Sequence, residues 1–462
     1  MWRFFLFLLL HISCCLQAQQ WISPAAVTDL RNWDAEKKRI FSLEGKWEFY
    51  WKKYLNPSDF RSEKVLKPDL LVRSGSWNDL EIDDKKLGGE GYATYRMVLK
   101  NLPAKTLMLD IYSVQTSCRI FINDSLMLEI GKPGTSKEST TPMTRDAQLN
   151  IPGNTRTAEI IVQIANFHHR KGGFVHPFEI GLSQRIIRHH MLNYMLQIVE
   201  SSSLFIIGLF LLALYIFRRK DLSILYFSLF CVTLAFRPII AVNYLVATLF
   251  NGINWHLMVK MEYLAVLFPC LFMLLFIRQL FPDQLPRMFT KILSVILAIK
   301  VIITLFFPPS VFSWLIPPLL VIISIGVIVF AMTIVRAVMA KVDGARYAGM
   351  GLIILLCSLL LKVLVYSNII PPVHILITAL DIGFIFMMSL ILGARFSLQF
   401  VKVERLQQIT EIQRRDIEQK KAAIEEKNKN IIDSINYAQR IQASLLPTER
   451  YFQKYMDKLR GK

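Results

Sequence analysis

Charged residues and cysteines are both scarce in this sequence. Only 19% of its 462 residues are charged, whereas 53% are hydrophobic, and the mean hydropathy is +0.39. A chain with so few charged residues is not intrinsically disordered. Its fraction of hydrophobic residues is also higher than is usual in soluble proteins. A membrane protein with room for about three folding units of roughly 150 residues is therefore the first hypothesis.

Acidic residues are fewer than basic ones. The 54 Lys and Arg against 35 Asp and Glu give a formal charge of +19. Such an excess is typical of proteins that bind nucleic acid or anionic lipid, and of membrane proteins with basic cytoplasmic loops. The basic residues are spread over loops and an acid-containing tail, and no basic stripe alternates with aromatic residues. We therefore expect no binding of nucleic acid.

The six cysteines predict neither a disulfide framework nor a zinc site. Five of them lie in apolar stretches, at Cys14, Cys15, Cys231, Cys270 and Cys357, and Cys118 is alone in the polar N-terminal region. No cysteines pair with each other or with histidines at a suitable spacing. We expect no metal and no cofactor.

Residues 1–18 are typical of a cleaved secretory signal. Arg3 precedes a short apolar run that ends at Leu16-Gln17-Ala18. One alternative is an uncleaved anchor helix, although roughly 12 apolar residues are short for a span that needs about 20. The other is a lipoprotein signal at Cys14 or Cys15, although the Leu that is usual three residues upstream is missing.

Residues 19–190 have the composition of a soluble domain built from strands. Apolar residues alternate with others in three short runs, at Tyr95, Met97 and Leu99, at Leu107, Leu109 and Ile111, and at Ile160, Val162 and Ile164. This alternation predicts strands with one face in a core. Residues 119–131 are typical of a hairpin, because Asn123 and Asp124 tolerate the left-handed conformations of a tight turn. Many short strands predict an all-β sandwich.

Seven apolar segments of about 18 to 25 residues follow within residues 191–398, each long enough to cross a membrane. Their expected limits are 194–217, 221–240, 256–278, 289–307, 312–335, 345–366 and 372–395. The second is the least well defined, because Arg237 lies near its end and residues 238–250 could instead re-enter the membrane.

The charges in the loops predict the orientation. Arg218, Arg219 and Lys220 follow the first segment, and Arg and Lys also flank the third and fifth loops, whereas residues 307–310 and 368–372 contain neither. Basic loops favour the cytoplasm. We therefore expect a multi-pass membrane protein with its N-terminal domain outside the cytoplasm and its C-terminus inside, an orientation that the signal peptide also requires.

Residues 399–446 predict a cytoplasmic helix, since no Gly or Pro occurs from Lys402 until Pro447. Ile417, Ile424 and Ile431 repeat every seven residues, but the second heptad column is polar, which predicts at best a weak coiled coil. The isoleucine seam either joins two copies of the chain in a homodimer or lies on a solvated helix. Residues 447–462 are expected to be the stub of a missing or truncated effector domain.

Aromatic landmarks follow one another in the N-terminal domain, at residues 43–49 (LEGKWEF), Trp77, 91–96 (GYATYR), 102–103 (LP), 120–123 (IFIN) and 161–166 (IVQIAN). In this order they resemble the jelly-roll, galactose-binding-like domain of many sugar hydrolases and certain bacterial receptors. Asp124 departs from that pattern, because the turn often carries Gly there. The resemblance implies a small-molecule or carbohydrate ligand.

Together with the seven spans, this order of parts resembles the seven-transmembrane receptors with diverse intracellular signalling modules (7TMR-DISM). Residues 432–447 (IDSINYAQRIQASLLP) are similar to the linker that precedes the catalytic core of SpoIIE-type serine phosphatases. The resemblance implies a receptor of the bacterial inner membrane, with a periplasmic N-terminal domain, that relays an external ligand through seven helices to a dimeric cytoplasmic helix. The alternative is the sensor portion of such a phosphatase, whose catalytic core is missing from this chain. Only Glu449 and Asp457 follow Leu446, too few carboxylates for a two-metal site, so we expect no enzymatic activity of this chain. A transporter is a further alternative, although no internal repeat favours it.

Aromatic and polar residues of the N-terminal domain are candidates for the ligand site, since sugar faces stack on rings and sugar hydroxyls need fixed hydrogen bonds. They are Trp77, Tyr92, Tyr95, Arg96, Asn166, His168 and His169. The alternative is that the aromatic residues form the core. Gly172 and Gly173 would let a ligand or another backbone come close, and their loop could equally rest on the membrane domain. No carboxylate accompanies the histidines at metal-ligand spacing.

Four charged residues lie inside the apolar segments, namely Glu262, Lys300, Lys362 and Asp381. Charges within a membrane are costly and are usually paired or functional. Either they pair inside the bundle, or the lysines extend to the interface, or they form a polar switch.

Overall fold

The computed structural model describes residues 26–461 apart from 37–39, 63–65, 175, 218, 220, 242–252, 367–369, 371–372 and 447–448. The expected signal peptide and most of the segment expected as a possible re-entrant stretch lie outside the described residues. The chain divides into two compact units, Met1–Leu392 and Gly393–Lys462.

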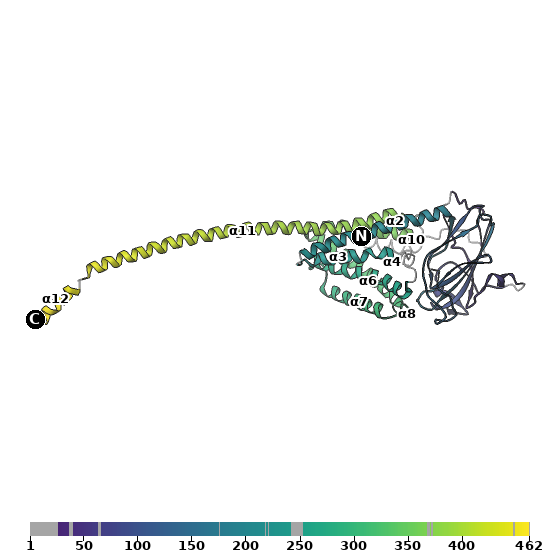
Figure 1. Cartoon of the computed structure of the whole chain (residues 1–462), viewed down its shortest axis with the longest axis horizontal. Coiled ribbons are helices and arrows are strands. Elements are labelled where there is room, and N and C mark those ends of the chain that lie inside the picture. The colour runs from purple at the N-terminus through teal and green to yellow at the C-terminus, as the bar shows by residue number, and fades with distance from the viewer. Residues whose placement is uncertain are drawn as a thin grey trace. The chain divides into compact units, whose positions relative to one another are not determined.

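Two β-sheets form the N-terminal part of the first unit, which we call the β domain (Figure 1). The larger sheet has the order β11-β10-β13-β7-β3-β4, with β1 beside β7, and the smaller has the order β12-β8-β15-β2. The larger sheet contains β1 (Val27–Asp29), β3 (Trp47–Trp51), β4 (Leu70–Val72), β7 (Gly91–Lys100), β10 (Ser117–Ile122), β11 (Ser125–Ile130) and β13 (Thr157–Asn166). The smaller sheet contains β2 (Ile40–Ser42), β8 (Leu107–Ile111), β12 (Ala147–Ile151) and β15 (Glu179–Leu182).

Short elements connect these strands. Two strand pairs are β5 (Glu81–Ile82) with β6 (Lys85–Lys86), and β9 (Val114–Gln115) with β14 (Gly173–Phe174). Two 3₁₀ turns are η1 (Pro57–Arg61) and η2 (Trp77–Asp79).

Strand β7 has the predicted alternation. Tyr95, Met97 and Leu99 are buried, whereas Val98 is half-buried and Lys100 is exposed. Buried residues of both sheets belong to one hydrophobic cluster, so the sheets share a core. The β10–β11 hairpin was also predicted correctly, and its turn residue Asn123 has a φ of 53°, the left-handed conformation that Asn tolerates.

Strand β8 departs from simple alternation. Leu107, Leu109 and Ile111 are buried as predicted, but Met108 and Asp110 on the opposite face are buried as well. The second face is covered because the first long helix packs against this strand, and His190 of that helix contacts Asp110. The face of β8 that points away from the core is therefore a contact between the β domain and the helices.

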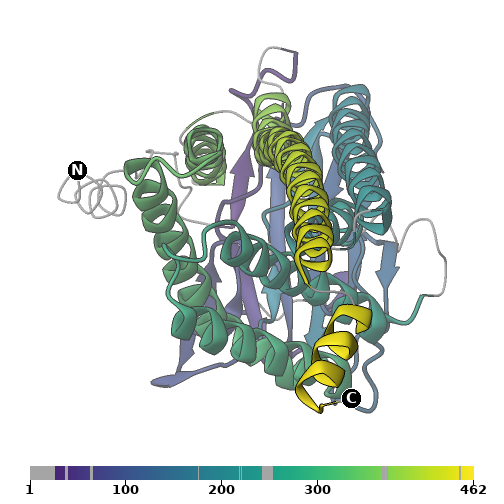
Figure 2. The ribbon, with the colours of Figure 1, turned by 90° about the vertical axis from the view of Figure 1, so that its left-hand side faces the viewer.

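The helices of the first unit are α2 (Ser183–Phe217), α3 (Leu222–Ala235), α4 (Arg237–Ala241), α6 (Trp255–Leu280), α7 (Arg287–Phe306), α8 (Pro309–Phe312), η3 (Ser313–Leu315), α9 (Ile316–Met339), α10 (Ala345–Tyr366) and the start of α11 (His374–Leu445). Among the described residues, seven helical segments are long and apolar enough to cross a membrane, close to the seven predicted positions. Figure 2 views several of these helices nearly end-on, side by side.

Helix α2 begins earlier than predicted. Its first residue, Ser183, directly follows the last residue of β15, Leu182. The expected domain boundary at residue 190 therefore falls inside the helix, because strand and helix are joined without a loop. The second unit contains the rest of α11 and α12 (Glu449–Leu459).

Candidate functional site: the contacts between sheets and helices

Two sets of contacts join the β domain to the helices of the first unit. The loop contact is made by residues 166–173, which follow β13 and reach α6 and η3. The acid contact is made by Asp110, Asp146 and Glu179 of the β domain around His190 of α2. Both could pass a change in the sheets to the membrane helices.

The loop contact is built from hydrogen bonds and rings. Nε2 of His169 lies 3.2 Å from the hydroxyl of Tyr263 on α6. The backbone N–H of Arg170 donates to Oγ of Ser313 in η3 over 3.2 Å. The ring centroids of His168 and Trp255 lie 6.2 Å apart. These contacts confirm the alternative interpretation of this loop, namely that it rests on the membrane domain.

Further contacts extend this set into the bundle. Nε1 of Trp255 donates to Oγ1 of the buried Thr144 over 2.7 Å. The rings of Tyr263 and Phe312 are 4.7 Å apart, and the carbonyl of Phe312 accepts a hydrogen bond from Nζ of Lys300. The predicted intramembrane residue Lys300 thus lies next to the loop contact.

Asn166 fixes the shape of the loop. Its buried side-chain amide donates to the carbonyls of Gly89 over 2.7 Å, His169 over 2.6 Å and Lys171 over 3.1 Å. Its Oδ1 accepts from the N–H of His169 over 3.1 Å. A buried amide that satisfies three carbonyls leaves no donor for a ligand.

The glycine pair lets the loop close on the core. A Cβ at Gly172 would lie 2.4 Å from the ring of Trp77. Gly173 has a φ of 95°, which favours glycine, and a Cβ there would lie 2.9 Å from the carbonyl oxygen of Gly75. The close approach that the sequence predicted is therefore made by a core ring and another backbone.

The electrostatics of the loop keep His169 neutral. Burial, reinforced by the charges of Arg170 and Lys171, lowers its pKa to about 4, while the carbonyl of Lys171, which can accept a hydrogen bond from the ring, opposes the shift. A neutral imidazole can both accept and donate, as its neighbours Tyr263 and Lys171 require.

The acid contact lies on the outer face of the smaller sheet. Nε2 of His190 is 2.6 Å from Oδ2 of Asp110, and both side chains are almost fully buried. The amide of Gln148 donates to Oδ1 of Asp110 over 3.2 Å. Oδ1 of Asp146 accepts from the N–H of Ser113 over 3.0 Å.

Burial raises the pKa values of two of these acids. The pKa of Asp146 rises to about 6, through burial and the nearby charge of Asp110, against the donated N–H of Ser113. The pKa of Glu179 is also raised by burial, although the hydroxyl of Tyr112 donates to it over 3.1 Å. Both acids are therefore easier to protonate than exposed carboxyls.

The aromatic candidates for a ligand site lie in the core. Trp77 and Tyr95 are fully buried, and Nε1 of Trp77 donates to the carbonyl of Gly89 over 3.2 Å. Half-buried Tyr92 packs on Tyr54, with ring centroids 4.9 Å apart. These positions agree with the alternative that the aromatic residues form the core. The rings of Trp77 and Tyr95 are not accessible to a ligand from solvent.

Arg96 is also held within the β domain. Its guanidinium pairs with Glu48 at 2.8 Å and Glu159 at 2.6 Å, and it lies 4.7 Å from the ring centroid of Phe60. Of the seven residues predicted for a ligand site, only His168 and His169 contact the membrane helices. The other five make their contacts within the β domain.

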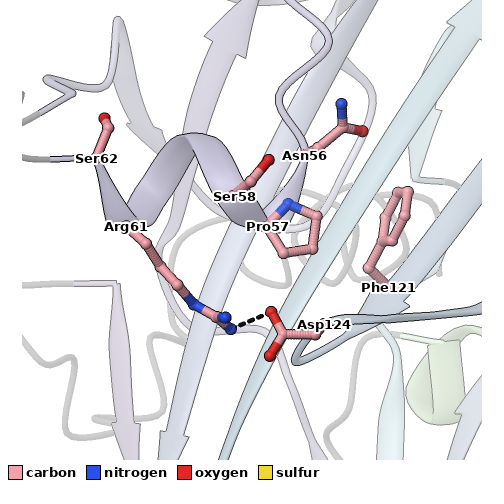
Figure 3. A pocket seen from close by; sticks show the side chains of 7 residues that line it. All are labelled: Asn56, Pro57, Ser58, Arg61, Ser62, Phe121 and Asp124. Carbon is pink, nitrogen blue, oxygen red and sulfur yellow. Dashed lines mark ion pairs between the residues drawn. The ribbon is translucent and has the colours of Figure 1, made fainter.

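A shallow depression of about 530 Å³ lies elsewhere on the β domain, between η1 and the β10–β11 turn (Figure 3). Arg61 and Asp124 form an ion pair at its edge. Phe121 contributes a ring, and the remaining lining residues are Asn56, Pro57, Ser58 and Ser62. A small polar molecule in this depression could contact an aromatic ring, a positive and a negative side chain, and serine hydroxyl groups.

The intramembrane charges are partly paired. Nζ of Lys362 on α10 lies 2.8 Å from Oδ2 of Asp381 on α11, and Oγ of Ser358 donates to the same carboxylate over 2.6 Å. Glu262 is half-buried on α6. The pairing of Lys362 with Asp381 agrees with the simpler of the expected roles. Among the described residues, no group of three or more His, Cys, Asp or Glu could hold a metal ion.

The tail of α11 is exposed. Ile417, Ile424 and Ile431 have exposed fractions of 63%, 58% and 56%. Charged pairs four residues apart line the helix, namely Arg414–Glu418, Arg415–Glu411, Lys420–Asp416 and Lys421–Glu425. The predicted isoleucine column is therefore present as an uncovered apolar seam.

The acid contact and the helix partners of the loop were not predicted from the sequence. One signal for Asp110 was available, because a charged residue stood inside the apolar strand 107–111. Tyr263, Ser313 and Trp255 carried no such signal, since their partners are far away along the chain.

Comparison with known proteins identifies the membrane domain. Residues 193–395 match the model of the family described as 7TM diverse intracellular signalling. The chain is thus a multi-pass membrane protein whose helices match a family of transmembrane signalling receptors. No curated protein matches the chain.

Similar solved structures include two bacterial β-glucuronidases. That of Ruminococcus gnavus is 15% identical with a TM-score of 0.23, over 30% of this chain and 28% of the enzyme. That of Faecalibacterium prausnitzii is 14% identical with a TM-score of 0.24, over 30% of this chain and 31% of the enzyme. The chain thus covers less than a third of either enzyme, and likenesses this weak support no conclusion about it.

Proposed function

We propose that this protein is a receptor that senses a molecule outside the cytoplasm through its β domain and relays the signal through seven helices to a cytoplasmic helix. The observation that carries the proposal is the loop contact, in which His169 and Arg170 of the β domain meet Tyr263 and Ser313 of the bundle. A change in the loop would act directly on α6 and η3. The family match of residues 193–395 supports a signalling role for the helices.

The ligand in this proposal is a small polar molecule such as a carbohydrate, bound at the depression beside Arg61. Support comes from its composition, because Phe121 can stack on a sugar face while Arg61, Asp124 and serine hydroxyls can bind its hydroxyl groups. The β domain is, in this proposal, a jelly roll of the galactose-binding type, as its sequence landmarks indicate.

Binding to the full-length protein in nanodiscs would test the ligand class. We expect at least one member of a panel of mono- and disaccharides to bind, and we expect Phe121→Ala and Arg61→Ala each to weaken its binding about tenfold, close to 1.4 kcal/mol. Arg73→Ala, at an exposed position away from the depression, should leave binding unchanged. Equal binding by all variants would contradict this site.

The output in this proposal is a pair of α11 tails joined along Ile417, Ile424 and Ile431. Support comes from the exposure of all three side chains, since an apolar seam on a membrane-tethered helix gains by burial against a partner. The similarity of residues 432–447 to a SpoIIE linker supports a role in coupling to an effector. The tail and the basic loops lie in the cytoplasm in this proposal.

Cysteine crosslinking in membranes would test the pairing. In a full-length chain whose six native cysteines are replaced, single cysteines at 417 or 424 should crosslink efficiently. Single cysteines at Gln419 and Glu426, on the opposite side of the helix, are the matched controls and should crosslink poorly. Equal crosslinking at both sets would contradict a fixed helix pair.

A further inference from the structure

The acid contact has an unusual position in the smaller sheet. Asp110 lies on the central strand β8, directly opposite Gln148 of β12 and Glu179 of β15. Cross-strand neighbours point to the same face, so these side chains share the outer face of the sheet. An open sheet face would leave them in water, but α2 covers Asp110, which is 1% exposed.

Helix α2 places one imidazole against this acidic face. Nε2 of His190 is 2.6 Å from Asp110 and 3.4 Å from the amide of Gln148. Among the described residues, no Lys or Arg forms an ion pair with Asp110, Asp146 or Glu179. Three carboxyl groups thus surround a single group that can become positive.

The surrounding titratable groups come from several elements. Asp110, Asp146 and Glu179 act on His190, which also has His189 beside it on α2. Tyr112, Glu44 and His176 lie on the side of the β domain, and Tyr194 and His374 lie on α2 and α11. None of these adds a permanent positive charge.

Ionisation of all three carboxyls is therefore unfavourable in the packed contact. His190 can neutralise one negative charge, and the other two remain on half-buried side chains. Oδ2 of Asp146 also has no hydrogen-bond partner among the described residues, so an ionised Asp146 would have a buried oxygen without a donor. When α2 moves away from the sheet, water can solvate the charges.

We propose that the acid contact is a proton-binding site, with Asp146 and Glu179 as the groups that take up the protons, and that protonation holds the β domain against α2. Loss of these protons leaves uncompensated negative charge between β8, β12, β15 and α2 and loosens the contact. The raised pKa values of Asp146 and Glu179 agree with this direction.

The site lies beside the helix that contains the tail. The ring of His189 is 6.0 Å from that of His374, in the first turn of α11. A shift of the first turns of α2 would therefore change the surroundings of α11. This last step rests on the proposed receptor function, whereas proton binding at the contact does not.

Hydrogen–deuterium exchange on the full-length protein in nanodiscs tests the site. After normalising for chemical exchange rates, we expect residues 183–193 and 107–112 to be roughly tenfold or more better protected at about pH 5 than at about pH 7.5, since one pKa unit of coupling corresponds to tenfold. Asp146→Asn stays neutral and can still accept from Ser113, so its protection should fall much less between the two pH values than that of the wild type, since only Glu179 still loses a proton. Asp79→Asn, an exposed control, should behave as the wild type.

A second measurement covers the case in which Asp146→Asn does not fold. The infrared difference spectrum of the wild type between the two pH values should show the carboxylic-acid band of a buried acid that ionises near pH 6, the value set by Asp146. Equal protection of the wild type at both pH values, an unchanged pH dependence in Asp146→Asn, or a wild type without that band would overturn the proposal. These outcomes leave the crosslinking of the tail unaffected, so failure of this site and failure of the receptor function are distinguishable.

Discussion

The two contacts between the β domain and the helices differ in their chemistry. The loop contact uses a neutral imidazole, a backbone N–H, hydroxyl groups and rings. The acid contact uses carboxyl groups around His190. One β domain is thus attached to its helices both by groups that stay neutral and, in our proposal, by groups that change charge.

This difference gives the contacts opposite responses to acid. His169 has a pKa of about 4 when packed and about 6.5 when free, so the free loop binds the proton more tightly and the loop contact weakens as pH falls below about 6.5. Asp146 has a pKa of about 6 when packed and about 3.9 when free, so the packed form binds the proton more tightly and the acid contact strengthens as pH falls from about 6 to 4. Acid would therefore shift the attachment of the β domain from α6 and η3 toward α2.

The largest effect is expected from breaking the acid contact. Asp110→Ala removes the partner of His190 in a buried pair and should reduce the free energy of unfolding by about 3–5 kcal/mol. Denaturant unfolding of the full-length protein in detergent would measure it. Asp79→Ala, at an exposed position, should change stability by less than about 0.5 kcal/mol. A loss below about 1 kcal/mol for Asp110→Ala would mean that the pair is not buried as described.

A smaller effect is expected from forcing the loop off the core. Gly172→Ala places a Cβ 2.4 Å from the Trp77 ring and should cost about 1–3 kcal/mol, because the core must shift. Gly75→Ala is the matched control, since nothing lies within 4 Å of its added Cβ. Thermal unfolding compares the two. Equal stability of both variants would contradict the close packing of the loop.

His169 allows a separate test of whether the loop contact responds to pH. His169→Gln keeps a hydrogen-bonding side chain for Tyr263 but cannot be protonated, so exchange protection of residues 166–173 should no longer fall between about pH 6.5 and 4. In the wild type we expect a loss of about 1 kcal/mol over this range, allowing for partial exposure to solvent. A wild-type loop with constant protection across this range would show that the loop contact does not titrate.

The smallest effect is expected outside both contacts. Glu418→Ala removes an exposed pair with Arg414 on the tail and should lower helix stability by about 0.3–0.5 kcal/mol. Circular dichroism melting of the full-length protein would show almost no shift. A loss above about 1 kcal/mol would indicate that this face of the helix has a partner.

Local pattern predicted much of the fold. The alternation of Tyr95, Met97 and Leu99 predicted β7, and the length of the apolar segments predicted all seven spans. Both kinds of pattern can be recognised because each is formed by residues that are close together in the sequence. The start of α2 at Ser183 was missed because polar residues such as Arg185 and His189 open a helix that is not yet apolar. Pattern alone cannot show that a helix leaves a strand without a loop.

The contacts with the helices were harder to predict than the elements. His168 and His169 were named as candidates for a ligand site, whereas the structure places them against Trp255 and Tyr263, which are almost a hundred residues away along the chain. Trp77 and Tyr95 were candidates because aromatic residues serve both cores and sugar sites. Only burial separates these two roles, and burial depends on how distant strands pack.

In the proposed relay, the state of the β domain reaches the tail of α11, and the crosslinking rate at position 424 reports whether it does. In membranes containing the full-length, otherwise cysteine-free chain with Ile424→Cys, the crosslinking rate would be measured with the native contacts and with Tyr263→Phe, which removes the hydroxyl that meets His169. We predict a change of roughly fivefold or more, the lower end of typical coupling between sites. Identical rates in the two chains, with the seam still crosslinking in preference to Glu426, would contradict the relay.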